Sequence, residues 1–412
     1  MKRKLVINYR NLLMGGIEDI ISILIKNSID MNDEIIWLSD VEPKISPIYK
    51  DLLRDSHITR IPCNIHGVYW SKVNNVEFLN NGEIVIISFS FFDHIRVLQL
   101  IKKSHNSNIK PYYIIPHFTG GLVFPEQLVW NLKIVRCFAG KIYRRWLQAN
   151  MLVYCGKRHA DKLSENYKGN FIYENGLFPN IEGRAPFDEG VVRRNYHNTK
   201  FRIVTAGRLD FPHKGFVVGL LKSFIRLKSD RRYNKLELFI IGEGKGRSEL
   251  SKIVDACEPI IATDIHFLDN MSKDKLVDFF HTCNLNISVA GCFTLGAQNG
   301  LLSLPARHYS FDCEVYGFSP NSIGCSLEDK PGEPVEKYIV KAMKLSEKEY
   351  VDYCRSSYNA YDVPTVDKNA FFNQNNIDTG YIIGRKEILF GQIVFYFDKI
   401  KFYFHKFFLR DI

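Results

Sequence analysis

The sequence lacks several patterns that would by themselves assign a fold or a chemistry. Its nine cysteines include no C-x-x-C pair, which argues against a zinc site and against a disulfide framework. No apolar run approaches the roughly 18 residues of a membrane-spanning helix. No Asp-x-Asp pair lies in a suitable loop, no cluster of His and Asp has metal-ligand spacing, and no segment repeats at solenoid or propeller periods. We therefore expect a globular protein with buried thiols in a reducing compartment.

What the chain does have is an excess of positive charge, with 55 Lys and Arg against 45 Asp and Glu and a net charge of +10. Such a surface suits nucleic acid, an anionic membrane or phosphorylated substrates, or it serves solubility alone. The basic residues are dispersed and no nucleic-acid-binding motif is present, so we expect no nucleic-acid partner. The N-terminus could pass for a weak signal peptide, but Asn8, Arg10 and Asn11 interrupt its apolar part. A first strand and a cytoplasmic location fit the segment better.

A length of 412 residues predicts two domains, and strand-like and helix-like segments alternate along the chain. In the first half, strands are predicted at 5–9, 34–38, 83–90, 112–116 and 151–156, and helices at 17–27, 94–103 and 157–166. In the second half, strands are predicted at 202–207, 237–244, 264–269 and 285–291, and helices at 215–228, 246–257, 272–282 and 296–303. This alternation predicts parallel βαβ units, and hence two doubly wound α/β sheets in tandem.

The domain boundaries follow from changes in composition. The stretch 180–200 is polar and aperiodic, and it is predicted to be a linker between a first domain at 1–179 and a second at 201–375. Residues 376–412 mix Phe and Tyr with Lys and Arg at helix-compatible spacing. We expect a terminal helix that returns to the first domain, with an interfacial element at a membrane as the alternative. Ligands of such sheets bind at the carboxyl ends of strands, so the cleft between two such domains is the expected site.

The segment 202–228 carries the strongest chemical signal. A short apolar strand leads into a loop that holds Arg208 and Lys214, and a helix with apolar residues at helical spacing begins at Gly215. The N-terminal end of a helix already carries partial positive charge, so a cation there is unfavourable unless an anion is bound. Two cations six residues apart on a strand-to-helix loop suit a diphosphate, which indicates a nucleotide-linked substrate.

Three motifs in order carry a resemblance to a known family. They are GRLDFPHKG at 207–215, LELFIIGEGKGRSEL at 236–250 and IHFLDNMSKDKLVDFFHTCNLNISVA at 265–290. Together they resemble the C-terminal domain of the GT-B glycosyltransferases, in the large retaining family that builds bacterial polysaccharides and lipopolysaccharides. The resemblance implies two Rossmann-like, doubly wound parallel-sheet domains that face each other across a cleft. It is weaker over the first half, through NLLMGGIED at 11–19 and NMLVYCGKRHADKLSENY at 150–167.

The resemblance also implies roles for individual residues. Arg208 and Lys214 match the basic pair that grips the donor diphosphate and stabilises the leaving group, and His117 matches a histidine that faces the transferred sugar. The expected substrate-binding residues are Gly15, Gly16, Thr119, Gly120, Gly207, Gly242, Glu243, Gly244, Phe293, Thr294, Leu295 and Gln298. An ordinary strand-to-helix turn at Gly15 and Gly16, a structural histidine and solvated surface cations are the alternatives.

One departure from the family pattern concerns the acidic residues. The family has two glutamates eight positions apart, and aligning on Pro305 places Ala290 and Gln298 at these positions. Gln298 can still hold ribose hydroxyls because an amide both donates and accepts hydrogen bonds. Ala290 cannot contact the sugar through a polar group, although main-chain amides around 291–295 can cup a phosphate at the start of a helix.

These observations predict a retaining, metal-independent glycosyltransferase without a cofactor. Its expected donor is a nucleotide-sugar, UDP-sugar first, and its expected acceptor a lipid-linked glycan of a bacterial surface polysaccharide such as O-antigen or capsule. Segments 133–148 and 385–412 combine basic and aromatic residues, which favours a peripheral location on the inner face of the plasma membrane; a solvated helix face is the alternative. Two other functions stay open, a sugar-nucleotide epimerase and a non-catalytic subunit that binds nucleotide or glycan.

Overall fold

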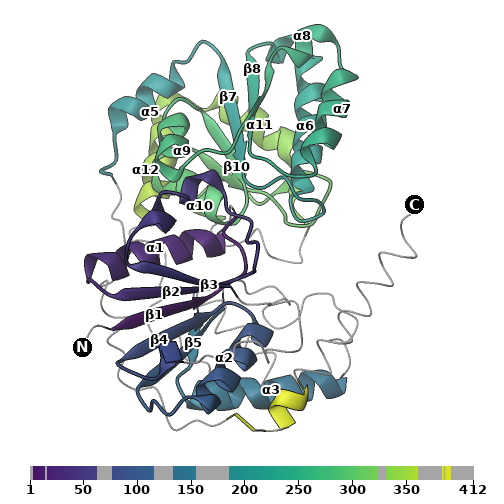
Figure 1. Cartoon of the computed structure of the whole chain (residues 1–412). Coiled ribbons are helices and arrows are strands. Elements are labelled where there is room, and N and C mark those ends of the chain that lie inside the picture. Colours follow the sequence, from purple (N-terminus) through teal and green to yellow (C-terminus); the bar gives the residue numbers. More distant parts are fainter. Residues whose placement is uncertain are drawn as a thin grey trace. The chain divides into compact units, whose positions relative to one another are not determined.

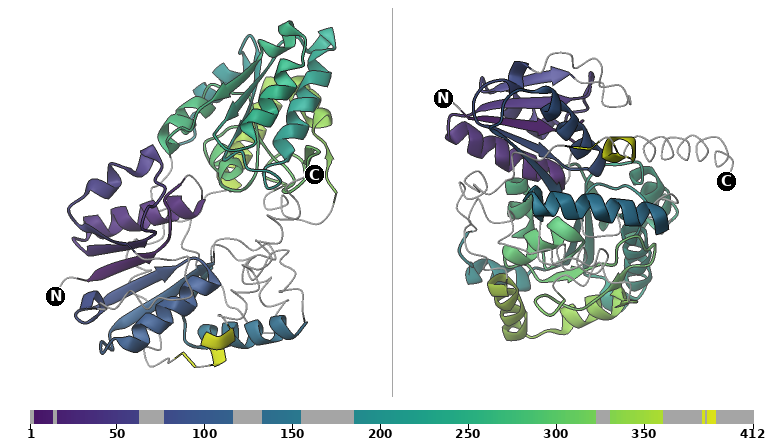
Figure 2. Two further views of the ribbon diagram at one scale, coloured as in Figure 1. Left: turned by 45° about the vertical axis from the view of Figure 1, so that its right-hand side comes forward. Right: turned by 90° about the horizontal axis from the view of Figure 1, so that it is seen from below.

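The structure is a computed structural model that describes residues 3–13, 16–62, 77–115, 133–154, 185–322, 331–360, 383–384 and 386–390. The chain divides into two compact units (Figure 1). Unit 1 comprises Met1–Ile181 and Thr365–Ile412, and unit 2 comprises Glu182–Pro364. Each unit contains one parallel β-sheet with helices packed against it, as the additional views show (Figure 2).

The sheet of unit 1 has six parallel strands in the order β3-β2-β1-β4-β5-β6. The strands are β1 (Lys4–Asn8), β2 (Glu34–Ser39), β3 (Ile58–Pro62), β4 (Ile84–Ser88), β5 (Ile109–Ile115) and β6 (Leu152–Tyr154), and the helices are α1 (Gly16–Asp30), α2 (Phe91–Lys103) and α3 (Lys133–Gln148). Leu5 and Ile7 lie in one apolar cluster and Val6 in another. Alternate residues of β1 thus point to opposite faces, and both faces of this sheet are buried.

The sheet of unit 2 has five parallel strands in the order β11-β10-β7-β8-β9. The strands are β7 (Phe201–Ala206), β8 (Leu236–Ile241), β9 (Ile265–Leu268), β10 (Leu285–Ser288) and β11 (Ser303–Pro305), with a short hairpin of β12 (Glu314–Val315) and β13 (Glu333–Pro334). The helices are α5 (Glu189–Tyr196), α6 (Phe216–Lys228), α7 (Arg247–Asp255), α8 (Pro259–Ala262), α9 (Lys273–Phe280), α10 (Ala290–Gln298), α11 (Val335–Lys344) and α12 (Glu347–Ala360). Its apolar residues again form clusters on both faces of the sheet.

The strand order locates where each sheet is able to bind a ligand. Strand order reverses between β1 and β4 in unit 1 and between β7 and β10 in unit 2. In doubly wound sheets, the loops that leave the two strands at such a switch point diverge and open a crevice at the carboxyl edge. In unit 2 these are the β7–α6 loop, with Arg208 and Lys214, and the junction of β10 with α10.

The predicted alternation of strands and helices is confirmed in the described residues, but several elements differ, and β11, α8, α11 and α12 were not predicted from the sequence. The stretch 180–200 is not irregular throughout, because 189–196 form α5, which the Asp188 carboxylate caps by accepting from the Val191 N–H. Strand β3 was not expected from the sequence. The strand predicted at 285–291 ends at Ser288, and the helix predicted at 296–303 instead spans Ala290–Gln298. Gly291 and Gly296 both lie within this helix.

Part of the C-terminal tail packs against unit 1. Residues 386–390 are helical, and the Glu387 carboxylate pairs with Arg145 of α3 at 2.8 Å. Ile383 is buried in the main apolar cluster of unit 1, and Phe390 stacks on Phe138 with 5.8 Å between ring centroids. The remainder of the predicted tail helix, and the helix predicted at 157–166, lie outside the described residues.

Candidate functional site

The β7–α6 loop of unit 2 is held rigidly against the β8–α7 loop. The Leu209 N–H donates to the Glu243 carbonyl at 2.8 Å, and the Gly246 N–H donates to the Leu209 carbonyl at 2.9 Å. A Cβ on Gly242 would lie 2.1 Å from the Gly207 carbonyl oxygen, and Gly242 has a φ of +138°. Glycine is therefore required there for the close approach of the two loops. The predicted element Gly242–Gly244 therefore fixes the position of the loop that carries Arg208 and Lys214.

Lys214 is buried, with 8% of its surface exposed, although it carries an ammonium group. Its Nζ has no hydrogen bond and no ion pair with any residue that the structure describes. It lines a narrow hollow at the carboxyl end of β7 together with Thr205, Ala206, Gly207, Leu209, Phe216 and Val217. Burying a cation without a partner is costly, so this position is suited to a charged ligand.

The surroundings of Lys214 set its pKa. Burial lowers the pKa of Lys214 below its usual value, Cys292 opposes this shift, and the nearby Arg208 lowers the pKa further. A second polar group in the same hollow, the Thr205 hydroxyl, is also buried without a hydrogen-bond partner among the described residues.

Arg208 differs from Lys214 in its environment. Its side chain is about half exposed, and its Nε pairs with the Asp210 carboxylate at 2.8 Å. The two predicted phosphate-binding cations are brought near enough to interact electrostatically, but only Lys214 lacks a counter-ion within the described chain. The alternative of two solvated surface cations is wrong for Lys214.

Helix α10 follows β10, which is the neighbour of β7 in the sheet, so α10 begins at the same carboxyl edge as the β7–α6 loop that carries Lys214. No side chain caps the N-terminus of α10, and its first turn contains no acidic residue. Ala290 and Gly291 are exposed, and nothing lies within 4 Å of the position of a Cβ on Gly291. Ala290 has a φ of +49°, a strained left-handed conformation at the point where the chain turns from β10 into α10.

The structure places the other residues predicted on α10 in different surroundings. The Phe293 side chain is buried against Ala297 and Gln298 is buried, whereas Thr294 and Leu295 are partly exposed. Glu243 at the β8–α7 turn is exposed, and its carboxylate accepts from the Asn270 amide at 3.0 Å.

In unit 1, Gly16 is exposed at the first position of α1, and a Cβ there would meet nothing within 4 Å. The first turn of α1 contains two carboxylates: Glu18 accepts from the Tyr9 hydroxyl and Asp19 from the Tyr49 hydroxyl. Because these acids already satisfy the helix dipole, the α1 N-terminus is less suited to a phosphate than that of α10. Gly15, His117, Thr119 and Gly120 lie outside the described residues, so their predicted roles stay predictions.

Two groups of residues near the switch points were not expected from the sequence. In unit 1, His94 is fully buried, burial lowers its pKa to about 3, and its Nδ1 lies 2.8 Å from the Ser88 hydroxyl. In unit 2, His213 and His308 approach within 3.3 Å, and Tyr309 packs on His213. His213 and His308 come from loops distant in sequence, whereas Ser88 and His94 lie close together in sequence, at the end of β4 and in α2.

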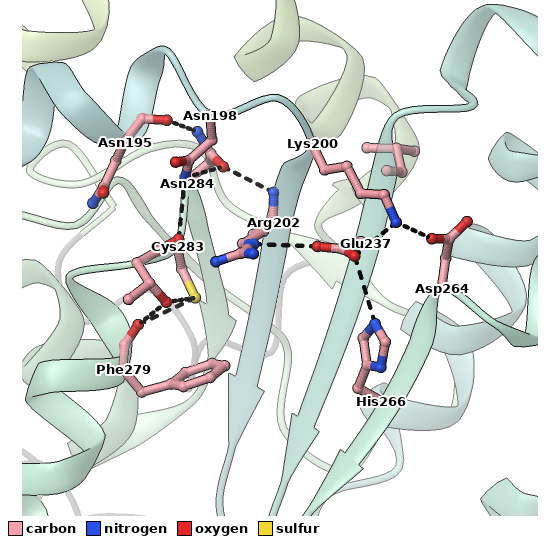
Figure 3. Close-up of polar contacts among 12 residues, drawn as sticks. Asn195, Asn198, Lys200, Arg202, Glu237, Asp264, His266, Phe279, Cys283 and Asn284 are labelled. Carbon is pink, nitrogen blue, oxygen red and sulfur yellow. Dashed lines mark hydrogen bonds and ion pairs between the residues drawn. The ribbon is translucent and has the colours of Figure 1, made fainter.

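The opposite edge of the unit 2 sheet holds an ion-pair network and not a ligand site (Figure 3). At the start of β7, Lys200 donates to Glu237 at 2.9 Å and to Asp264 at 2.7 Å, and Arg202 donates to Glu237 at 3.2 Å. Burial raises the pKa values of both carboxylates, but the hydrogen bonds from Lys200 and its neighbours outweigh burial, so both pKa values lie below their usual range. These cations are neutralised, unlike Lys214.

The described residues contain no group of three or more His, Cys, Asp or Glu that could hold a metal ion. This finding extends to the described ranges alone. At the carboxyl edge of the unit 2 sheet, the described charged residues include the cations Arg208 and Lys214 and the carboxylates Asp210, Glu243 and Asp269, the last paired with Arg247.

Two Rossmann-like domains in tandem, each with a parallel sheet and a switch point, define the class of the protein: the chain has the GT-B fold. Anabaena HepE, in complex with UDP and glucose, is 12% identical at a TM-score of 0.57, over 95% of this chain and 97% of that one. WaaG, a glycosyltransferase involved in lipopolysaccharide biosynthesis, is 12% identical at a TM-score of 0.55, over 88% of this chain and 96% of that one.

A third similar structure comes from Listeria monocytogenes and is named as a candidate UDP-N-acetylglucosamine 2-epimerase. It is 11% identical at a TM-score of 0.51, over 90% of this chain and 95% of that one. At such low identity, these similarities establish the fold alone. No protein-family profile matches the chain, and no curated protein matches it.

Proposed function

We propose that the protein is a glycosyltransferase that moves a sugar from a nucleoside-diphosphate sugar to a hydroxyl of a glycan acceptor. The observation that carries this proposal is Lys214, a buried ammonium without a partner among the described residues, at the switch point of the unit 2 sheet. A buried cation without a counter-ion favours an anion such as a diphosphate, and α10, which has no side-chain cap, begins at the same edge of the sheet. UDP-sugar is the first donor to test, because the similar HepE structure holds UDP and glucose.

The proposed chemistry follows from the charges. In the reaction, the bond between the anomeric carbon and the phosphate oxygen breaks, and negative charge grows on the departing diphosphate. The acceptor oxygen bonds to that carbon and gives its proton to the departing phosphate oxygen. Lys214 and Arg208 stabilise this charge, with the α10 N–H groups as further donors. We propose that these groups act in place of a metal ion and that the anomeric configuration is retained, as the family resemblance implies.

The acceptor is proposed to be a lipid-linked glycan at the inner face of a bacterial membrane. On the surface of α3, Phe138 is 44% exposed, its ring lies under the Lys141 ammonium at 5.6 Å, and Arg144 is exposed. Leu389 in the neighbouring tail segment is exposed as well. Basic groups around apolar side chains suit an anionic bilayer surface. None of the described helices has the length and apolar character to cross a bilayer.

Turnover with UDP-sugars tests the proposal. The purified chain is incubated with a UDP-sugar panel, with and without a glycolipid extract, and UDP release and product masses are followed. Acceptor-dependent UDP release together with a glycosylated acceptor supports the transferase. An epimeric UDP-sugar formed without acceptor establishes the epimerase function instead. The structure of the candidate epimerase from Listeria has the same fold. Nucleotide binding without any turnover favours a non-catalytic subunit.

A Lys214→Met variant connects this activity to the site. Lys214→Met removes the charge and keeps the apolar stem, whereas Lys222→Met makes the same change at an exposed position of α6. We expect turnover to fall at least about 100-fold in Lys214→Met, since stabilisation of a leaving group by one fixed charge is worth several kcal/mol. The control variant keeps its activity. Equal rates in both variants would contradict the assigned role of Lys214.

A further inference from the structure

The two strands at the switch point of the unit 2 sheet, β7 and β10, are joined by a side chain near the carboxyl edge. Main-chain pairing of these strands extends as far as Val204 and Asn286. Beyond this pair, the buried N–H of Ala206 donates to the Ser288 hydroxyl at 3.3 Å. A side chain of β10 thus holds the end of β7 at the point where the loops that follow the two strands diverge.

Asn286 connects this hydrogen bond to α10. Asn286 and Ser288 are two residues apart in one strand, so their side chains lie on the same face of the sheet, and both are fully buried. The Asn286 Oδ1 accepts from the Ser288 hydroxyl at 2.7 Å, and its Nδ2 donates to the Cys292 carbonyl in the first turn of α10 at 3.1 Å. Nδ2 also donates to the Ser303 hydroxyl of β11 at 3.3 Å. A continuous chain of hydrogen bonds therefore runs from the end of β7 through β10 to α10.

Helix α10 packs closely on this chain of hydrogen bonds. A Cβ on Gly296 would lie 2.4 Å from the Asn286 Nδ2, so glycine allows α10 to approach the sheet this closely. The Cys292 side chain packs on the apolar cluster that contains Ala206. Ala206 in turn lines the hollow that contains Lys214. The hydrogen bonds of Asn286 therefore join the wall of the Lys214 hollow to the first turn of α10.

The polarity of these side chains is unusual for a buried parallel strand, which is commonly apolar throughout. Val204, which pairs with Asn286 in register, lies in an apolar cluster. Apolar side chains of similar volume would fill the same space without hydrogen bonds to satisfy. A buried polar network in which the members are hydrogen-bonded to one another fixes one arrangement of the elements that it joins. The elements joined here are β7, β10, β11 and α10.

We propose that Asn286 is a positioning residue of the Lys214 site, which holds the end of β7 and the first turn of α10 at one fixed spacing. It acts through the Ser288 hydroxyl towards β7 and through the Cys292 carbonyl towards α10. Its loss moves these elements apart and weakens ligand binding without removing a group that touches the ligand. That the ligand is a nucleoside diphosphate rests on the proposed function, whereas the chain of hydrogen bonds does not.

Asn284 offers a matched control, because it is buried directly before the same strand, at the opposite edge of the sheet (Figure 3). Its Nδ2 donates to the Asn195 carbonyl of α5 at 2.6 Å, and its Oδ1 accepts from the Arg202 N–H at the start of β7 at 2.8 Å. Asn284→Leu and Asn286→Leu therefore each remove a buried amide with its hydrogen bonds, and both should lower the stability of unit 2. The hydrogen bonds of Asn284 lead to α5 and the start of β7, away from the Lys214 hollow.

Calorimetric titration of the full chain with UDP tests the assignment. Asn286→Leu should weaken UDP binding about tenfold at unchanged stoichiometry, Ser288→Ala should weaken it in the same direction, and Asn284→Leu should bind like wild type. A merely structural role would lower the folded fraction, and with it the stoichiometry, but not the affinity of the folded protein. Equal loss of affinity in both leucine variants, or wild-type affinity in folded Asn286→Leu, overturns the proposal. If Asn286→Leu fails to fold, wild-type affinity in Ser288→Ala overturns it.

Hydrogen exchange separates this inference from the proposed function. Exchange of the Ala206 amide, measured against the amides of β8, should become about tenfold faster in Ser288→Ala and Asn286→Leu and keep its wild-type ratio in Asn284→Leu. Faster Ala206 exchange in a protein that binds no nucleotide contradicts the diphosphate site and supports the chain of hydrogen bonds. Unchanged Ala206 exchange in a wild type that binds UDP overturns the role of Asn286 and leaves the diphosphate site standing.

Discussion

At the scale of single residues, the central feature is a lysine whose charge is not compensated by the chain that surrounds it. Burial lowers the pKa of Lys214 because the ammonium loses hydration, and the chain returns only part of this loss through Cys292. Lys200, at the other end of the same strand, is half exposed and bonded to two carboxylates, and its pKa is raised. The same residue type thus has a structural role at one edge of the sheet and is available to a ligand at the other.

This difference predicts how nucleotide binding depends on pH. A diphosphate requires the charged ammonium, so UDP affinity should be constant at low pH and fall as pH rises through the lowered pKa of Lys214, well before an ordinary lysine loses its proton. In that pH range binding takes up a proton. Calorimetry in buffers of different ionisation enthalpy measures both effects. If UDP affinity stays constant up to the usual pKa of lysine, about 10.4, that would contradict the claim that Lys214 binds the diphosphate.

At the scale of elements, the site depends on close contact between two loops. Gly242→Ala places a methyl group 2.1 Å from the Gly207 carbonyl and imposes a side chain on a φ of +138°. We expect it to lower the free energy of unfolding of unit 2 by at least about 2 kcal/mol. Gly291→Ala is the control, because its Cβ meets nothing within 4 Å, and it should leave stability unchanged or raise it by up to about 1 kcal/mol.

The probe for this comparison must report on unit 2. All four tryptophans of the chain belong to unit 1, so hydrogen exchange of β7 and β8 is the suitable measure of stability. Equal exchange protection in Gly242→Ala and Gly291→Ala would contradict the prediction, because it would show that the β7–α6 and β8–α7 loops can separate without a loss of stability.

The network at the amino edge of the same sheet predicts a dependence on acid. Glu237 and Asp264 have lowered pKa values in the folded protein, so the stability they contribute is present above their unfolded pKa values and is lost as pH falls through the folded ones. Unit 2 should therefore lose stability below about pH 4. Lys200→Met should cost about 1 kcal/mol at neutral pH, a value discounted because Lys200 is half exposed. Lys200→Met should also reduce the difference between the free energies of unfolding at pH 7 and at pH 3. An undiminished difference would contradict the role assigned to the ion pairs of Glu237 and Asp264.

At the scale of the whole molecule, the sequence predicted the two sheets because both are built from apolar runs separated by helices with clear periodicity. It also located Lys214 just before α6, since the strand, the loop and Gly215 are local features. The start of α10 was missed because Ala290 adopts a left-handed conformation that no periodicity encodes. The pair His213–His308 joins loops distant in sequence, so only the folded sheet brings it together.

The proposed membrane surface belongs to this scale as well. Lys141→Gln together with Arg144→Gln removes two exposed charges around Phe138 on α3. At about 1 kcal/mol for each basic residue, binding to anionic vesicles should weaken roughly 30-fold. Lys222→Gln with Lys252→Gln removes the same charge from exposed positions of unit 2 and should have little effect. Co-sedimentation with vesicles measures the difference, and equal binding by both double variants would contradict a surface on α3.

The claim that Lys214 holds the diphosphate of a nucleotide-sugar is tested most directly by calorimetric titration of the full chain with UDP, GDP, dTDP and CMP. Wild type and Lys222→Met should bind one nucleoside diphosphate, UDP first, with equal affinity, and Lys214→Met should bind it at least about tenfold more weakly, the loss expected for one charge-assisted contact. If no nucleotide binds wild type, or if Lys214→Met binds as tightly as wild type, the buried lysine is not the phosphate ligand and the proposed transfer reaction loses its structural basis.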